Sequence, residues 1–111
     1  MPKLVPDLEA CFLTLMDDKT MRRGNEMTGA QGVIFLCPKC FEMNKGSVGT
    51  HSVICWFKDR GIPDNMDPKP GRWNPSGTSL DDLTFVGPGA VSVLLTSGCG
   101  WHGFVKDGSA D

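Results

Sequence analysis

The residues best suited to chemistry are four metal donors arranged as two pairs. Two residues separate Cys37 from Cys40, and two residues separate Cys99 from His102. Thiolate and imidazole pairs at this spacing are the usual donors of a closed tetrahedral zinc site in a small protein. The sequence therefore predicts a Zn²⁺ ion bound by Cys37, Cys40, Cys99 and His102. Four protein ligands leave no position for water, which favours a structural metal over a catalytic one.

Other uses of these residues are less consistent with the pattern. A C-x-x-C pair also serves thiol–disulfide exchange, but that chemistry needs a thioredoxin-like βαβ context, which is not present. A Rieske cluster needs two histidines and two cysteines, and the first pair contains no histidine. A Cys₃His iron–sulfur cluster remains an alternative. The other histidine, His51, is a possible substitute ligand. It begins an apolar segment without a cysteine at pair spacing, however, so we expect it to be structural or solvent-facing.

Size and composition favour one globular domain over residues 1–111. The chain is 40% hydrophobic and 22% charged, which is enough apolar content for a core. The net charge of −2 gives no basic field and argues against nucleic-acid binding. No apolar run approaches the ~20 residues of a membrane span. The five cysteines are an odd number and no secretory leader is visible, so we expect reduced thiols and a cytoplasmic location.

The apolar pattern predicts a mainly β, small α+β fold in which antiparallel sheets are clamped by zinc. Residues 51–57 carry bulky side chains on both faces, so we expect a central strand there. A turn is expected at residues 106–108. Strands are expected over residues 33–36, 51–57, 83–86, 90–95 and 103–105.

The N-terminal part, residues 1–32, is expected to hold a short helix and then a loop over residues 17–32. Apolar residues recur at helical spacing within residues 7–16, and Pro6 suits a first helical turn. The alternation of Cys11, Leu13 and Leu15 would also suit an edge strand. The helix is favoured, and residues 33–108 are assigned to the zinc-bound β core.

Four residues beside the predicted metal site are candidates for ligand binding: Trp73, Ser76, Asp82 and Trp101. Trp73 lies in a Gly- and Pro-rich segment, and tryptophan side chains commonly form the walls of sites for flat or cationic ligands. The alternative is that the tryptophans belong to the core and that an aspartate of the Asp81–Asp82 pair bonds backbone amides near residues 75–79. Adjacent aspartates diverge in a turn, and no nucleophilic triad is visible, so no catalytic residue is predicted.

Residues 33–108 contain several motifs in a fixed order: C-P-K-C, W-x-x-S-G, D-D-L-T-F and C-G-W-H-G. This series resembles a family of small uncharacterised proteins of tailed phages and prophages, many of which carry the label "ammonia monooxygenase". The resemblance implies a zinc-binding β domain of phage origin but no activity, since a true ammonia monooxygenase is a multi-subunit membrane copper enzyme. The expected architecture resembles a zinc ribbon or the β-tent of methionine sulfoxide reductase B, Yippee and cereblon. The reductase cysteine motif is not present.

Together these observations predict a non-enzymatic, zinc-stabilised phage accessory protein of the host bacterial cytoplasm. It would bind a host protein or a small ligand, as an inhibitor of a host defence component does. One alternative is a hydrolase-type zinc enzyme in which only three of the donors bind the metal and one coordination position is open. Another is a nucleic-acid binder that uses the zinc knuckle.

Overall fold

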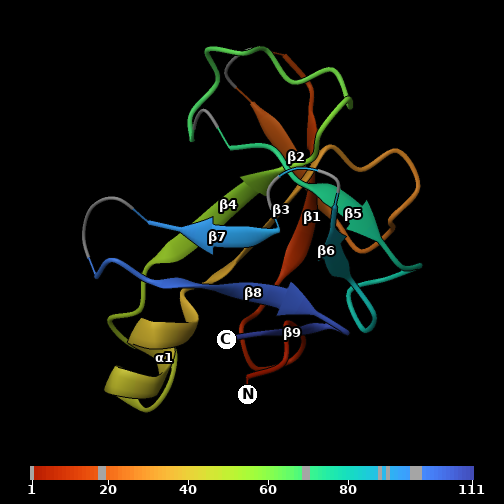
Figure 1. Ribbon diagram of the computed structural model, residues 1–111. Coiled ribbons are helices and arrows are strands. Elements are labelled where there is room, and N and C mark those ends of the chain that lie inside the picture. Colours follow the sequence, from red (N-terminus) through yellow and green to blue (C-terminus); the bar gives the residue numbers. More distant parts are fainter. Residues whose placement is uncertain (1, 18–19, 69–70, 88, 90, 96–98) are drawn as a thin grey trace.

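The computed structural model describes residues 2–17, 20–68, 71–87, 89, 91–95 and 99–111. Over these residues the chain forms nine strands and one short helix, and the strands make three antiparallel sheets (Figure 1). The predicted mainly β class is confirmed. The single described helix, α1, covers Pro38–Asn44 and is not N-terminal.

The largest sheet has four strands in the order β2-β1-β3-β4. Its strands are β1 (Cys11–Leu15), β2 (Met21–Gly24), β3 (Gly32–Leu36) and β4 (Ser52–Trp56). The strand expected over residues 33–36 is therefore β3, and the one expected over residues 51–57 is β4. The segment expected to be a loop, residues 17–32, contains all of β2.

The N-terminal helix prediction is wrong, because β1 takes its place. β1 lies between β2 and β3, so it is not an edge strand either. Phe12 and Leu13 are adjacent and both buried. An inner strand that is buried on both faces loses the period of two, and the remaining apolar spacing then resembles that of a helix.

The bulky residues of β4 predicted a central strand. That prediction is wrong, because β4 lies at the edge of its sheet. The chain just beyond it is nevertheless covered, because Phe57 forms an isolated parallel bridge with Trp73. The Lys58 amide donates to the Trp73 carbonyl at 2.7 Å, and the Trp73 amide donates to the Trp56 carbonyl at 3.1 Å. This bridge explains why both faces of the segment carry large side chains although β4 is outermost in its sheet.

The other two sheets are small. β5 (Asn74–Ser76) pairs with β6 (Thr84–Val86), and β7 (Ser92–Leu94) pairs with β8 (His102–Lys106), which pairs with β9 (Ser109–Ala110). Strands were expected at β6, β7 and β8, whereas Ala90, at the start of the segment predicted to contain β7, lies outside the described residues. The expected turn at residues 106–108 joins β8 to β9.

Residues 2–4 lie beside β9 and close the three-stranded sheet on that side. Lys3 bridges Ser109, the Leu4 amide donates to the Gly108 carbonyl at 2.8 Å, and the Ala110 amide donates to the Pro2 carbonyl at 3.1 Å. The two ends of the chain therefore meet, as Figure 1 shows.

A row of aromatic side chains links the sheets in the core. The Phe57 ring meets Phe12 of β1 edge to face at 6.3 Å and Phe85 of β6 at 6.4 Å. Trp73 stacks on Phe85 at 5.7 Å. The four-stranded and two-stranded sheets thus share one core, whose largest fully buried side chains include Trp56, Phe12, Phe35, Phe57 and Phe85.

The turn between β8 and β9 supplies a test of backbone conformation. Gly108 has a φ of 75°, and a Cβ at this position would overlap the carbonyl oxygen of Asp81. We expect Gly108→Ala to lower the free energy of unfolding by about 1–3 kcal/mol or more, through the strained φ and the displaced carbonyl. Gly24→Ala is the control, because a Cβ there meets nothing within 4 Å. Thermal unfolding of both variants checks the difference; equal midpoints would contradict it.

Candidate metal centre

The site is built where β3 ends and α1 begins. Cys37 stands at the N-terminal end of α1 with an extended φ of −61° and ψ of 122°, and Pro38 occupies the first helical turn. Proline is favoured there because its missing N–H would have no helical partner. Cys40 follows three residues after Cys37, and residues three apart lie on the same side of a helix. The C-x-x-C pair is therefore presented by a helix start.

The strand pairing of β3 with β4 brings His51 to the same place. Leu36 is paired with Ser52, so the next residue pair outward along the two antiparallel strands is Cys37 with His51. The Cys37 amide donates to the His51 carbonyl at 2.9 Å. His51 is thus positioned by register, although 13 residues separate it from Cys37 in the sequence.

Cys99 completes the group from the segment before β8. Its Sγ lies 3.4 Å from the Sγ of Cys37 and 3.4 Å from the Nε2 of His51. The Lys39 ammonium donates to the Cys99 carbonyl at 2.9 Å and holds this segment against α1. The donor atoms of Cys37, Cys40, His51 and Cys99 all lie within 4.8 Å of one another.

His102 is not part of this cluster, and the fourth predicted ligand is corrected to His51. His102 is the first residue of β8, where exposed His102 and Phe104 alternate with buried Gly103 and Val105. Trp101, just before it, is also buried. Because successive side chains of an extended chain point to opposite faces, His102 turns to solvent and cannot form a knuckle with Cys99.

The signal for His51 was present in the sequence but depended on register. Two adjacent strands, the first ending at a cysteine and the second starting after a histidine, bring those residues together if they pair as a hairpin. The length and irregularity of residues 37–51, which contain α1, concealed that pairing. Pair spacing alone selected His102.

The protonation of the thiols reflects unequal surroundings. Burial raises the pKa of the Cys37 thiol to about 12. Desolvation also raises the pKa of Cys40, with a further increase from its hydrogen bond with Cys99. The hydrogen bond from His51 is the main cause that lowers the pKa of Cys99 to about 6. Without a cation, the cluster thus favours one thiolate beside the imidazole.

This donor set fits zinc. Zn²⁺ binds sulfur at about 2.3 Å and imidazole nitrogen at about 2.0 Å, which places tetrahedral donors roughly 3.5–3.8 Å apart. Two of the separations, from Cys99 Sγ to Cys37 Sγ and to His51 Nε2, are 3.4 Å and lie close to these values, and all four donor atoms lie within 4.8 Å of one another. The backbone amides of Cys40 and Lys39 donate hydrogen bonds to the Cys37 sulfur and lower its pKa. They stabilise the thiolate, but burial raises the pKa by more than these bonds lower it. A divalent cation would supply the remaining compensation and allow the buried thiols to bind as thiolates.

The other candidate residues have different surroundings. Trp73 is 8% exposed, stacks on Phe85 and donates its Nε1–H to the Ser92 carbonyl at 3.0 Å. It is a core residue, in agreement with the alternative interpretation, and does not face a ligand. Ser76 is exposed at the end of β5.

Asp82 organises the turn after β5. Its carboxylate accepts hydrogen bonds from the amides of Thr78 and Ser79, both at 2.8 Å, and from the Thr78 hydroxyl at 3.0 Å. These are the backbone bonds expected of one aspartate of the pair. The amides of Ser79 and Thr78 lower the pKa of the Asp82 carboxyl.

That lowered pKa predicts a pH dependence. A carboxyl whose pKa is lower in the folded state contributes stability above its unfolded-state pKa, and the contribution is lost as the pH falls through the folded value. We expect Asp82→Asn to be less stable than the original chain at pH 7, and the difference to shrink below about pH 4. Urea unfolding at pH 7 and pH 3 measures it. Asp81→Asn is the control; a constant Asp82→Asn difference at both pH values would refute the prediction.

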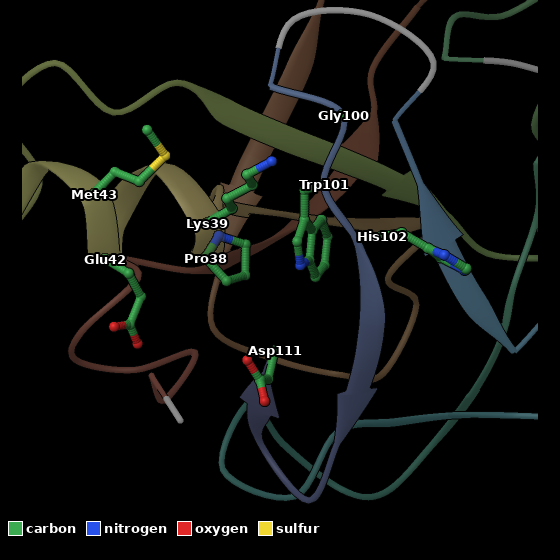
Figure 2. A pocket seen from close by; sticks show the side chains of 8 residues that line it. All are labelled: Pro38, Lys39, Glu42, Met43, Gly100, Trp101, His102 and Asp111. Carbon is green, nitrogen blue, oxygen red and sulfur yellow. The ribbon is translucent and has the colours of Figure 1, made fainter.

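Trp101 is 4% exposed, and its ring meets Phe35 edge to face at 6.0 Å. An edge of the indole lines a pocket beside α1 together with His102 (Figure 2). Of the four candidates for ligand binding, Trp101 is therefore the one that lines a pocket close to the metal cluster.

Within the described part of the chain, no helix has the length and apolar character needed to cross a membrane. Comparisons of the chain with protein-family models, with curated proteins and with solved structures found no match. The function is therefore inferred from the geometry of the site.

Proposed function

We propose that this chain is a non-enzymatic binding protein whose β domain is stabilised by one Zn²⁺ ion. The observation that supports the proposal is the convergence of Cys37, Cys40, His51 and Cys99 from three separate segments of the chain. Three thiolates and one imidazole satisfy all four positions of tetrahedral zinc and leave none for a substrate or a water. The metal then holds the fold, and the binding function belongs to the surface around it.

The energetic case for a structural metal is strong in a chain of this size. Domains of about 100 residues have a net stability of only about 5–15 kcal/mol. Structural zinc contributes roughly 10–16 kcal/mol of apparent binding free energy at neutral pH. The cluster joins the end of β3 and the start of α1 to the start of β4 and the segment before β8, so the metal would connect the four-stranded sheet to the three-stranded one.

The partner class rests on the motif resemblance. A phage accessory protein acts in the host cytoplasm, and a small domain without catalytic groups acts there by binding. We therefore propose a host protein as the partner, as for inhibitors of host defence components.

The metal part of the proposal is tested on protein purified without added metal. We expect elemental analysis to give one zinc per chain and zinc-edge X-ray absorption to give a first shell of three sulfurs and one nitrogen. An oxygen in the first shell would overturn the closed site and favour the hydrolase-type alternative. Iron with acid-labile sulfide would instead identify an iron–sulfur cluster.

The binding part is tested by affinity capture from host lysate with the zinc-loaded protein, followed by reconstitution with the purified partner. We expect a complex of defined stoichiometry between the two pure proteins. Detection of hydrolytic turnover, or of salt-sensitive binding to nucleic acid and no protein complex, would contradict it.

A further inference from the structure

A pocket of about 420 Å³ lies directly beside the cysteine cluster, between α1 and the segment that enters β8. Figure 2 shows its wall formed by the Pro38 ring and the Trp101 indole, with Met43 at the outer end of the helix. These side chains give the pocket an apolar wall. Both sides of the pocket belong to segments that carry cluster residues, since Cys37 and Cys40 flank Pro38 and Cys99 precedes Trp101 by two positions.

The charges of the pocket are not balanced. The carboxylates of Glu42 and Asp111 lie on the same side of it in Figure 2, beyond the Pro38 ring and the indole. Neither carboxylate accepts a hydrogen bond or forms an ion pair with another described residue. The cation that lines the pocket, Lys39, is already bonded through its ammonium to the Cys99 carbonyl at 2.9 Å. The His102 imidazole points away from the two carboxylates in the same view.

From this arrangement we propose that the pocket binds an arginine side chain presented by the partner protein. A guanidinium is planar, carries five N–H donors and is weakly hydrated, so it can bond carboxylates from two directions while it lies against apolar and aromatic groups. A lysine ammonium is a strongly hydrated point charge and gains less from the apolar wall. The proposal rests on the proposed function, because it names the chemistry by which the zinc-stabilised surface recognises its partner.

The first experiment uses the full, zinc-loaded chain and a blocked tripeptide, acetyl-Gly-Arg-Gly-amide. Nuclear magnetic resonance titration follows the Trp101 indole N–H and the amides of residues 39–43. We expect saturable shifts confined to these groups. The same peptide with lysine should bind more weakly, and the peptide with citrulline, which keeps the shape but lacks the charge, should not saturate.

Variants then locate the binding site. Glu42→Gln and Asp111→Asn each remove one charge with little change of shape, and each should weaken peptide binding by roughly tenfold, as expected for loss of a charge-assisted hydrogen bond. Asp64→Asn removes the same charge on the exposed loop before β5 and should leave the affinity unchanged. Equal effects of all three variants would show only a general charge effect and would overturn the proposal.

The experiment also separates this proposal from the proposed function. Zinc content is measured on each sample. Protein that holds one zinc but does not distinguish arginine from citrulline disproves the arginine pocket and leaves the zinc-stabilised fold intact. Protein that binds the arginine peptide equally well after zinc removal shows that the pocket is independent of the metal and contradicts the metal's role in holding this surface.

Discussion

Replacement of His51 by alanine should release the metal and unfold the domain, whereas replacement of His102 should do neither. His51 Nε2 lies 3.4 Å from the Sγ of Cys99 within the four-donor cluster. His102 is exposed on β8. Because the apparent binding free energy of structural zinc, roughly 10–16 kcal/mol, is comparable with the whole stability of a small domain, loss of one ligand should abolish cooperative folding.

The two histidines are the only ones in the chain, so the pair is a matched comparison. Elemental analysis and circular dichroism on purified His51→Ala and His102→Ala measure metal content and thermal unfolding. Cys99→Ser and Cys11→Ser extend the comparison to the thiols: the first removes a cluster donor, and the second removes a thiol of β1. If His102→Ala lost zinc and His51→Ala kept it, the C-x-x-H pair suggested by spacing would be the true site.

Phe57→Ala should be strongly destabilising although Phe57 lies outside the metal cluster. The Phe57 side chain is fully buried and contacts rings on both sides, Phe12 at 6.3 Å and Phe85 at 6.4 Å. Its removal leaves a cavity between two sheets, and substitutions of this kind cost about 3–5 kcal/mol. That is a large share of the stability expected for the domain, about 5–15 kcal/mol.

Phe104→Ala is the control for Phe57→Ala, because the Phe104 side chain is 53% exposed. Its cost should stay within about 0.5 kcal/mol. Chemical denaturation of the two variants in the presence of zinc measures both values. A smaller effect at Phe57 than at Phe104 would mean that the aromatic row does not join the sheets as described.

Strand positions after the N-terminal part of the chain were largely predictable. Residues 33–36, 83–86 and 103–105 are short apolar runs flanked by glycine, cysteine or turn residues, and each contains or overlaps a strand. Their local patterns agree with the tertiary structure, so short-range information is enough. The turn before β9 was predictable for the same reason, since Asp107 and Gly108 suit a tight connection.

The predictions for β1, β4 and Trp73 were wrong because their positions depend on pairing with distant segments of the chain. β1 becomes an inner strand only because β3 arrives beside it, and its sequence alone does not show that both faces will be covered. The edge position of β4 depends on the bridge between Phe57 and Trp73. The same bridge places Trp73 in the core, against the expectation of a ligand-facing loop tryptophan.

The metal ligands also include some that local sequence predicts and one that depends on distant pairing. The three cysteines that the structure brings together were selected by type and spacing, which are local properties. The histidine was selected by spacing too, but its true position follows from strand register. Alternation along β8 sends His102 outward, and pairing of β3 with β4 brings His51 inward.

The contact of residues 2–4 with β9 has a consequence for biosynthesis. The Leu4 amide donates to the Gly108 carbonyl, and the Ala110 amide donates to the Pro2 carbonyl. The metal cluster likewise cannot form until Cys99 is available to join Cys37. These contacts join residues that are far apart in the sequence, and proteins with many such contacts fold slowly. During translation the early strands would therefore emerge without the residues that cover them, and the domain would close in one late step once residues 99–110 have left the ribosome. Until then β1 and β3 expose apolar faces, so we expect chaperones to bind the nascent chain.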